Sequence, residues 1–218
     1  MGQIPQFTKK QAAVLKAFSQ NTYITNQGYF TGGTALSSFY LHHRDSEDID
    51  IFSKNRWESE KIYPILSNIV GKKGMITTRV VDPVFIYVLH FPDGEELKVD
   101  FAQYPYPQIE ISKKHIGNLK VDSLIDIAVN KLQTITQRQE VKDFVDLYFL
   151  LQKFTFWDLR QGVAEKFRMD IEPLLISSDF LAVENFTFLP RMRKSLTLVQ
   201  LKKFFRSQAV TLAKTMVE

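Results

Sequence analysis

Cysteine is absent from this sequence of 218 residues. Its absence excludes a disulfide scaffold, a cysteine-ligated zinc or iron–sulfur site and a cysteine nucleophile. Glycine and proline are scarce, with 9 and 8 residues, and apolar residues make up 44%, so collagen-like, low-complexity and disordered chains are excluded as well. No apolar run approaches the ~20 residues of a membrane-spanning helix, and the N-terminus lacks the apolar core of a signal peptide. We therefore expect a globular, cytoplasmic protein with no membrane partner.

Positive charge is in slight excess and is unevenly distributed. The net charge is +4. Residues 1–150 contain 17 basic and 17 acidic side chains, whereas residues 151–218 contain 11 basic and 7 acidic ones. A basic C-terminal part is typical of proteins that bind nucleic acid, although a solvated helix face has the same composition.

Hydrophobic periodicity and turn residues divide the chain into a mixed part and a helical part. Strands are predicted at 29–31, 48–52, 75–81, 84–91 and 95–102. Helices are predicted at 9–19, 34–43, 57–70, 121–138, 140–153 and 196–217, with two shorter helices between 156 and 186. The last predicted helix has one apolar stripe, which consists of Leu198, Leu201, Phe205, Ala209, Leu212 and Met216. The pattern indicates an α+β protein with a mixed sheet and flanking helices at residues 1–110, followed by a helical bundle at 111–218.

Two aspartates form the first candidate site. Asp48 and Asp50 lie two residues apart in a predicted strand, so their carboxylates share one face at a Cα spacing of ~6.6 Å, while Ile49 and Ile51 pack on the other face. Two like charges this close are stabilised by a cation between them. Mg²⁺ prefers such oxygen ligands and leaves positions open for phosphate. Two solvated carboxylates on an edge strand are the alternative.

A glycine turn precedes these aspartates. Thr31-Gly-Gly-Thr34 joins a predicted strand to a predicted helix, where backbone N–H groups can face an anion. A plain turn would have the same sequence, and no Walker motif follows it. A phosphate cradle near paired carboxylates is what phosphoryl or nucleotidyl transfer requires. Asp100, out of phase with the apolar residues of its strand, is a third candidate metal ligand or an ordinary exposed aspartate.

Charged residues also border or occupy apolar helix faces. Lys131 and Arg138 border the apolar face of their helix, and Asp143 lies on the buried side of the next helix. A buried carboxylate needs a partner. One interpretation is a structural ion pair of Asp143 with either cation; the other places Lys131 on a triphosphate and Asp143 beside an acceptor hydroxyl.

Arg44 is a further candidate for nucleotide binding. It would supply a cation between the glycine turn and the paired aspartates. The histidines carry less information, because His42 and His43 are adjacent on a predicted helix and cannot share a metal ion.

Four blocks of sequence together resemble the AbiEii/AbiGii nucleotidyltransferase toxin family. They are Gly32–Leu36, Tyr40–Arg44, Ser46–Phe52 and the stretch from Lys131 to Leu150, and they occur in the order seen in the family. The resemblance covers about residues 25–155. It implies a DNA polymerase β-type nucleotidyltransferase fold with a helical C-terminal domain, and a toxin of a type IV toxin–antitoxin or phage abortive infection system. It also implies transfer of a nucleotide from an NTP, with Mg²⁺, to an acceptor such as the tRNA 3′ end.

The resemblance implies roles for residues of the first part. Gly32, Gly33 and Thr34 would hold the triphosphate. Asp48 and Asp50 would bind the metal and act in catalysis.

It implies further roles in the helical part. Lys131 and Asp143 match a lysine and an aspartate of the family and would be catalytic, with Lys131 and Arg138 on the nucleotide. Lys142 stands where the family usually has arginine, and the two differ in hydrogen-bond geometry.

The acceptor and the partners are open at this point. An RNA acceptor and a cognate antitoxin are expected. A small-molecule or protein hydroxyl acceptor and a non-catalytic nucleotide-binding module are the alternatives, and the basic C-terminal part argues against an aminoglycoside.

Overall fold

The computed structural model describes residues 6–214, which form two compact units. Unit 1 comprises the chain up to Tyr40, Ser46–Tyr106 and Ile111–Ser123, and unit 2 comprises Leu41–Asp45, Pro107–Glu110 and the chain from Leu124 onward. Each unit is therefore assembled from segments that are separated in the sequence. The domain boundary expected between residues 110 and 111 stays a prediction.

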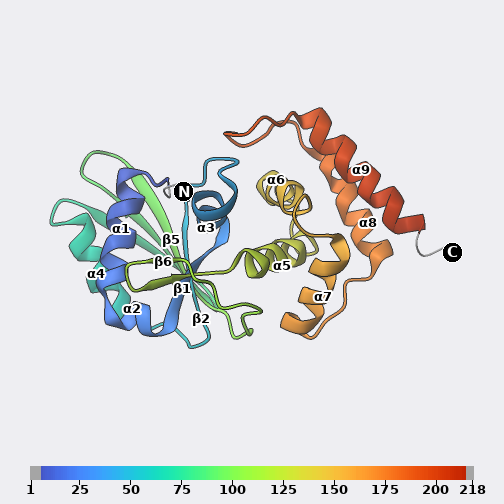
Figure 1. Cartoon of the computed structure of the whole chain (residues 1–218). Coiled ribbons are helices and arrows are strands. Elements are labelled where there is room, and N and C mark those ends of the chain that lie inside the picture. The colour runs from blue at the N-terminus through green and yellow to red at the C-terminus, as the bar shows by residue number, and fades with distance from the viewer. Residues whose placement is uncertain (1–5, 215–218) are drawn as a thin grey trace. The chain divides into compact units, whose positions relative to one another are not determined.

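A mixed sheet of seven strands forms the frame of unit 1 (Figure 1). In the described part of the chain, the strand order is β3-β4-β5-β2-β1-β7-β6. The strands are β1 (Gly28–Thr31), β2 (Ile49–Ser53), β3 (Met75–Val81), β4 (Val84–His90), β5 (Glu96–Gln103), β6 (His115–Ile116) and β7 (Leu119–Val121). The pairs β2–β5 and β1–β7 are parallel, and the others are antiparallel.

Helices flank this sheet. They are α1 (Lys9–Gln20), α2 (Thr22–Gln27), α3 (Gly32–Leu36), which continues as the π-helix η1 (Ser37–Leu41), and α4 (Ser59–Val70). A capping box of Thr8 and Gln11 begins α1. Helix α1 packs against α4, and α4 packs against β3 and β4. The rings of Phe18, Trp57 and Tyr87 meet the ring of Phe101 edge to face in this core.

The register of three central strands aligns polar residues in one row. Thr31 on β1 is the partner of Asp50 on β2, and Asp50 is the partner of Asp100 on β5. Ile49 and Ile51 are fully buried, as the alternation predicts. The row of polar residues therefore lies on the opposite face of the strands from this apolar core.

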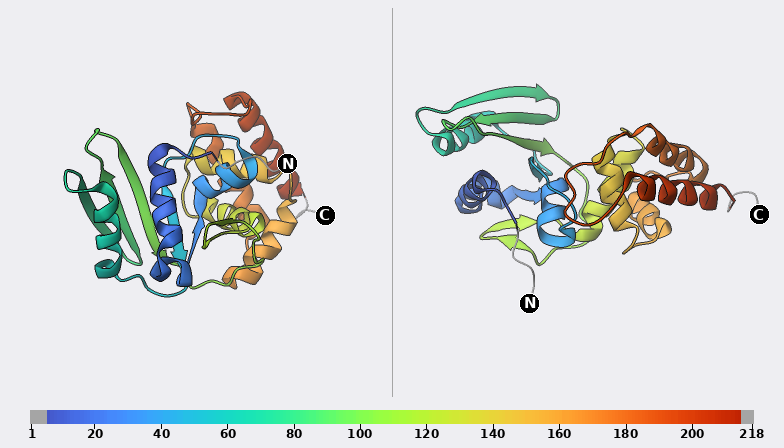
Figure 2. Two further views of the ribbon diagram at one scale, coloured as in Figure 1. Left: turned by 60° about the vertical axis from the view of Figure 1, so that its left-hand side comes forward. Right: turned by 90° about the horizontal axis from the view of Figure 1, so that it is seen from above.

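Unit 2 is helical, as Figure 2 shows from two further directions. Its helices are α5 (Leu124–Ile135), α6 (Val141–Leu150), α7 (Phe156–Phe167), α8 (Pro173–Leu181), the 3-10 helix η2 (Ala182–Asn185) and α9 (Leu198–Lys214). The apolar stripe predicted on α9 is buried at Leu201, Phe205, Ala209 and Leu212. Met216, the last residue of the predicted stripe, lies outside the described residues.

Local predictions were wrong at the start of one helix, and strands β6 and β7 and helix α2 were not expected. The helix expected from residue 121 begins at Leu124, because residues 119–121 pair with β1 as strand β7. The short helix α2 was not expected; it begins at the Asn21 cap, whose side chain accepts a hydrogen bond from Ile24 N. Hydrophobic periodicity reveals neither the pairing of a short strand nor a helix of only six residues that begins at a side-chain cap. Within residues 6–214, no helix is long and apolar enough to cross a membrane.

Candidate active site

Three carboxylates of unit 1 lie around one lysine. Asp50 and Asp100 are partners on adjacent strands, and Asp48 precedes β2 by one residue. Lys98 Nζ lies 2.6 Å from Asp100 Oδ2 and 3.5 Å from Asp48 Oδ2. Burial opposes the charge of Lys98, but the hydrogen bond to Asp100 and the charges of Asp100, Asp48 and Asp50 outweigh it and raise its pKa. The sheet thus gathers the three predicted acidic residues and places a cation among them.

The glycine turn packs directly on this group. Gly32 has φ +75°, and a Cβ built on it would lie 2.0 Å from Asp50 Oδ2. Gly33 follows it in the first turn of α3. Thr34 Oγ1 donates a hydrogen bond to the main-chain carbonyl of Asp48. The turn therefore positions both aspartates through a missing Cβ and a hydroxyl.

We expect Gly32→Ala to destabilise the protein more than a left-handed glycine normally would. Adopting φ above zero costs an alanine roughly 1–2 kcal/mol, and displacement of the Asp50 carboxylate adds to this cost. Gly94→Ala is the matched control, because Gly94 has φ +84° with nothing within 4 Å of its added Cβ. Thermal unfolding is measured for both variants. The extra fall in melting temperature of Gly32→Ala over Gly94→Ala measures the destabilisation caused by the clash with Asp50. Equal melting temperatures would contradict the close approach of Gly32 and Asp50.

A second charged group lies within unit 2 and centres on Asp146. Arg44 Nε and Nη2 donate to its two oxygens at 2.6 and 2.8 Å, and Lys131 Nζ lies 2.6 Å from Oδ2. His43 Nε2 donates to Oδ1 at 2.7 Å. Asp146 and His43 are fully buried, and Arg44 is 4% exposed. A carboxylate with three donors from two segments holds these segments together.

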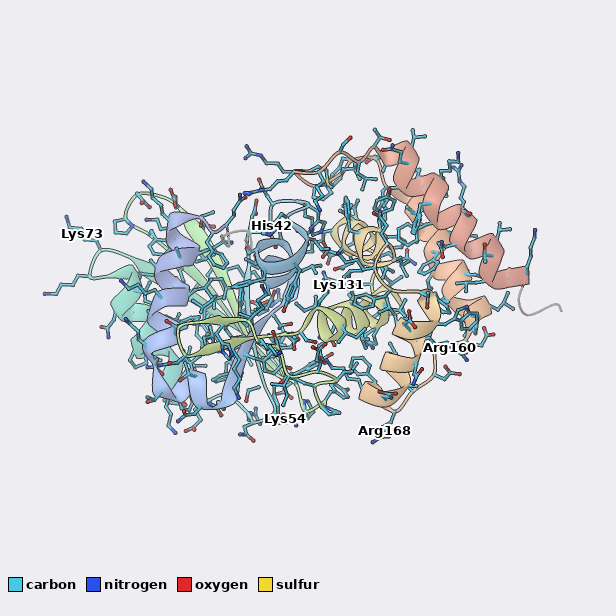
Figure 3. All side chains as sticks on the ribbon, in the orientation of Figure 1. His42, Lys54, Lys73, Lys131, Arg160 and Arg168 are labelled. Carbon is cyan, nitrogen blue, oxygen red and sulfur yellow. The ribbon has the colours of Figure 1, made fainter. Side chains whose placement is uncertain are left out.

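Asp143 extends the group along α6. Lys131 Nζ lies 2.6 Å from its Oδ1, and Arg138 Nε donates to its Oδ2 at 2.8 Å. Lys131 thereby bridges Asp143 and Asp146 from α5, where Figure 3 labels it. Both ion pairs of the structural interpretation are present. The catalytic roles expected for Lys131 and Asp143 stay predictions.

The charges in this group stabilise one another against burial. Burial would raise the pKa of Asp146, but the charges of Lys131 and Arg44 and hydrogen bonds from His43 and Arg44 hold it well below its usual range. The pKa of Asp143 is lowered in the same way by Lys131 and Arg138. Burial lowers the pKa of Lys131, yet Asp146 and Asp143 raise it more. All three side chains are therefore charged at neutral pH.

Several of these contacts were missed at the level of sequence. Arg44 was expected beside the glycine turn, whereas its guanidinium is occupied by Asp146; its nucleotide-binding role stays a prediction. A helical projection places Asp146 at the edge of the apolar face of α6, but it does not predict the partners Arg44 and His43. Lys98 stands two residues before Asp100 and therefore on the same strand face, which is a usable signal. Nothing in the local pattern marks His43.

Asp126 also departs from its helical pattern. It lies opposite the apolar stripe of its helix in projection, yet it is fully buried. Lys166 Nζ lies 2.7 Å from Asp126 Oδ1, and the backbone N–H groups of Ile109 and Glu110 donate to its carboxylate. This site holds the 107–110 segment on α5 and α7.

The two charged groups belong to different units, and each group is formed by residues of its own unit. Asp48, Asp50, Asp100, Gly32 and Thr34 are brought together in unit 1. The second group comprises Arg44, Lys131, Arg138, Asp143 and Asp146. Among the described residues, no group of three or more His, Asp or Glu side chains is arranged so that it could hold a metal ion.

Comparisons with known proteins agree with this architecture. A family model described as nucleotidyl transferase AbiEii toxin, type IV TA system, matches residues 14–211. An uncharacterized protein of Aquifex aeolicus (strain VF5) is 33% identical over 141 residues, or 63% of this chain and 64% of that protein. The chain thus spans less than two thirds of the length of that relative.

Solved structures share the fold at low sequence identity. JHP933 from Helicobacter pylori has a TM-score of 0.54 and 19% identity, covering 95% of this chain and 92% of that chain. MenT4, a nucleotidyltransferase toxin from Mycobacterium tuberculosis H37Rv, has a TM-score of 0.58 and 17% identity, covering 93% and 81%. The expected α+β nucleotidyltransferase fold is therefore confirmed. Because the family model spans most of the sequence, the chain belongs to the AbiEii nucleotidyl transferase toxin family of type IV toxin–antitoxin systems.

Proposed function

We propose that this protein transfers a nucleotide from an NTP to an RNA acceptor, the tRNA 3′ end, with Mg²⁺ as cofactor. It would act in the cytoplasm as a growth-inhibiting toxin with a cognate antitoxin. The observation that carries the proposal is the row of Asp50 and Asp100 on adjacent strands, with Asp48 beside them and Gly32 packed on Asp50. This arrangement joins an anion-binding turn to a group of hard oxygen ligands.

The oxygen donors are of the type that a hard dication prefers, although Lys98 pairs with two of the three carboxylates in this structure. Asp48, Asp50 and Asp100 offer carboxylate oxygens, which Mg²⁺ prefers. Lys98 already holds a positive charge against two of them, at 2.6 and 3.5 Å, so this place stabilises a cation. When bound there, Mg²⁺ would offset the charge of the triphosphate.

Residues of the chain would bind the triphosphate and act on the acceptor hydroxyl. Gly32 and Gly33 would present backbone N–H groups to the triphosphate, while Thr34 keeps Asp48 in place through its carbonyl. The acceptor hydroxyl would lose its proton and bond to the α-phosphorus, and pyrophosphate would leave. Lys131 and Asp143 are proposed to act on the triphosphate and on the acceptor hydroxyl. Their ion pair would open or turn toward substrate for this role.

The test incubates the purified chain with Mg²⁺, total tRNA and each of four α-labelled NTPs in turn. We expect label on tRNA with at least one NTP, no label when EDTA is present, and no label on tRNA whose 3′ diol has been oxidised with periodate. Label on intact and oxidised tRNA alike would overturn the 3′ end as acceptor. No label with any NTP would overturn RNA as the acceptor and leave a small-molecule or protein hydroxyl. Absence of NTP binding would indicate a non-catalytic module.

We expect Lys98→Met to bind a divalent cation more tightly. The lysine competes for Asp48 and Asp100. Two partly exposed ion pairs contribute about 0–1 kcal/mol each, so their loss should tighten Mn²⁺ binding by up to roughly thirtyfold. Binding is followed by the electron paramagnetic resonance signal of free Mn²⁺, without substrate. Lys120→Met, an exposed position on β7, removes the same charge as a control. Unchanged or weaker binding by Lys98→Met would contradict the competition.

A further inference from the structure

Three cations stand within four residues in the segment between η2 and α9. They are Arg191, Arg193 and Lys194, here called the cationic segment together with Met192. Backbone hydrogen bonds hold it to residues 43–45 of the same unit: Asp45 N donates to the Arg191 carbonyl and Arg193 N to the His43 carbonyl, both at 2.8 Å. Lys194 N also donates to the His43 carbonyl at 3.0 Å. The segment is thus anchored through its backbone to residues 43–45.

The side chains of this segment carry a surplus of positive charge at the surface. The side chain of Arg191 is 88% exposed and that of Arg193 is 44% exposed, and Asp45 forms ion pairs with both. Asp45 is thus shared by two arginines, and Lys194 Nζ lies 5.8 Å from the centre of the Phe149 ring. Burial lowers the pKa of His42, and Lys194 and Arg193 lower it further, which reports a positive potential at this place. Exposed ion pairs add little to folding stability, so stability does not account for the surplus.

The chemistry of the segment fits a single-stranded nucleic acid. Arginine forks bind phosphate oxygens in pairs. Arg191 and Arg193 both pair with Asp45, which places their guanidinium groups close together. Phe188, three residues earlier, is 70% exposed. An exposed ring close in sequence to anchored cations is a combination that can stack a base and hold its backbone, whereas an acidic protein surface needs no such ring.

We propose that the cationic segment binds the phosphodiester backbone of the RNA acceptor, with Phe188 against a base. This inference rests on the proposed function, because it names the surface that would hold the acceptor. It assigns to three cations and to Phe188 the binding role that the overall composition of residues 151–218 only suggested.

The test measures binding of a fluorescein-labelled tRNA by anisotropy as the KCl concentration rises. Each phosphate contact lowers the slope of log K against log salt by about 0.7–0.9, so the double variant Arg191→Gln/Arg193→Gln should flatten the slope by about 1.5. Lys153→Gln/Arg168→Gln removes two charges from exposed positions of the same unit and should leave the slope unchanged; Figure 3 labels Arg168. Phe188→Ala should weaken binding at every salt concentration with the slope kept. Equal slopes for both double variants would overturn the proposal.

The failure of this inference can be told from the failure of the proposed function. In the labelling assay, Arg191→Gln/Arg193→Gln should raise the KM for tRNA and keep kcat, because both residues lie outside the carboxylate group. Transfer by the wild type with an unchanged KM in the variant would overturn the inference alone. Slope flattening by the variant, with no transfer by the wild type, would support the surface and overturn the function. If Arg191→Gln/Arg193→Gln lost binding to an acidic protein but kept the binding to tRNA, RNA would be overturned as the partner of the cationic segment.

Discussion

We expect Asp50→Asn to lower nucleotidyl transfer by at least about 100-fold, the size of loss typical for a group that stabilises charge in the transition state. Asp50 is the central member of its row, with Asp100 as its partner on β5 and Gly32 packed against its carboxylate. Asparagine has nearly the same shape, so this packing is kept while the negative charge is lost. Like-charge repulsion among the carboxylates is also relieved. The melting temperature should therefore stay within about 2 °C of the wild type, a change below about 1 kcal/mol.

The control for this prediction is Glu47→Gln. Glu47 is exposed and immediately precedes Asp48, so the variant removes one carboxylate from the same loop without touching the row. Initial rates of label transfer to tRNA and thermal unfolding are measured for both variants. Full activity of Asp50→Asn would remove this aspartate from the site. Lost activity together with a strongly lowered melting temperature would assign it a structural role.

We expect Asp146→Ala to cost about 3–5 kcal/mol of folding free energy, the range for removing one partner of a buried ion pair. The variant leaves Arg44 and Lys131 buried without the carboxylate that each contacts at 2.6 Å. At roughly 2–4 °C per kcal/mol for a chain of this size, the melting temperature should fall by roughly 10 °C. Urea unfolding gives the free energy independently.

Asp170→Ala is a matched control for Asp146→Ala. Arg160 donates to Asp170 in the same bidentate way, from Nε at 2.9 Å and from Nη2 at 2.6 Å. The side chain of Asp170, however, is 64% exposed. An exposed pair contributes about 0–1 kcal/mol, so this control should unfold near the wild-type temperature. Equal losses in the two variants would show that burial of the Asp146 group does not determine its energy.

The same group predicts a loss of stability in acid. In the unfolded chain Asp143 and Asp146 bind protons near pH 4, whereas their lowered pKa values keep them ionised in the folded chain. Burial also lowers the pKa of His43, so the unfolded chain takes up its proton first as the pH falls below about 6.5. In each case the unfolded state binds more protons than the folded state, so the free energy of unfolding decreases as the pH is lowered. Urea midpoints between pH 7 and 3 should decline less steeply in Asp146→Asn; parallel curves would contradict this account.

Much of the fold and part of the site follow from local sequence. Strand alternation placed Ile49 and Ile51 in the core and left Asp48 and Asp50 on the other side, because successive side chains of a strand point to opposite faces. The apolar stripe of α9 and the hairpin of β4 and β5 follow from equally local periods and turns. The family was predicted from ordered blocks of residues and is confirmed by the family model.

Only the tertiary structure decided which distant residues meet. The parallel pairing of β2 with β5 aligns Asp50 with Asp100, and that register depends on strand partners far apart in the chain. Arg44 and Asp146 are 102 residues apart, and their contact gives both a buried counterion. Sequence by itself determined which side chains share a face of a strand or helix. Their charge partners were decided by packing, because a buried charge is stable only where the fold brings an opposite charge to it.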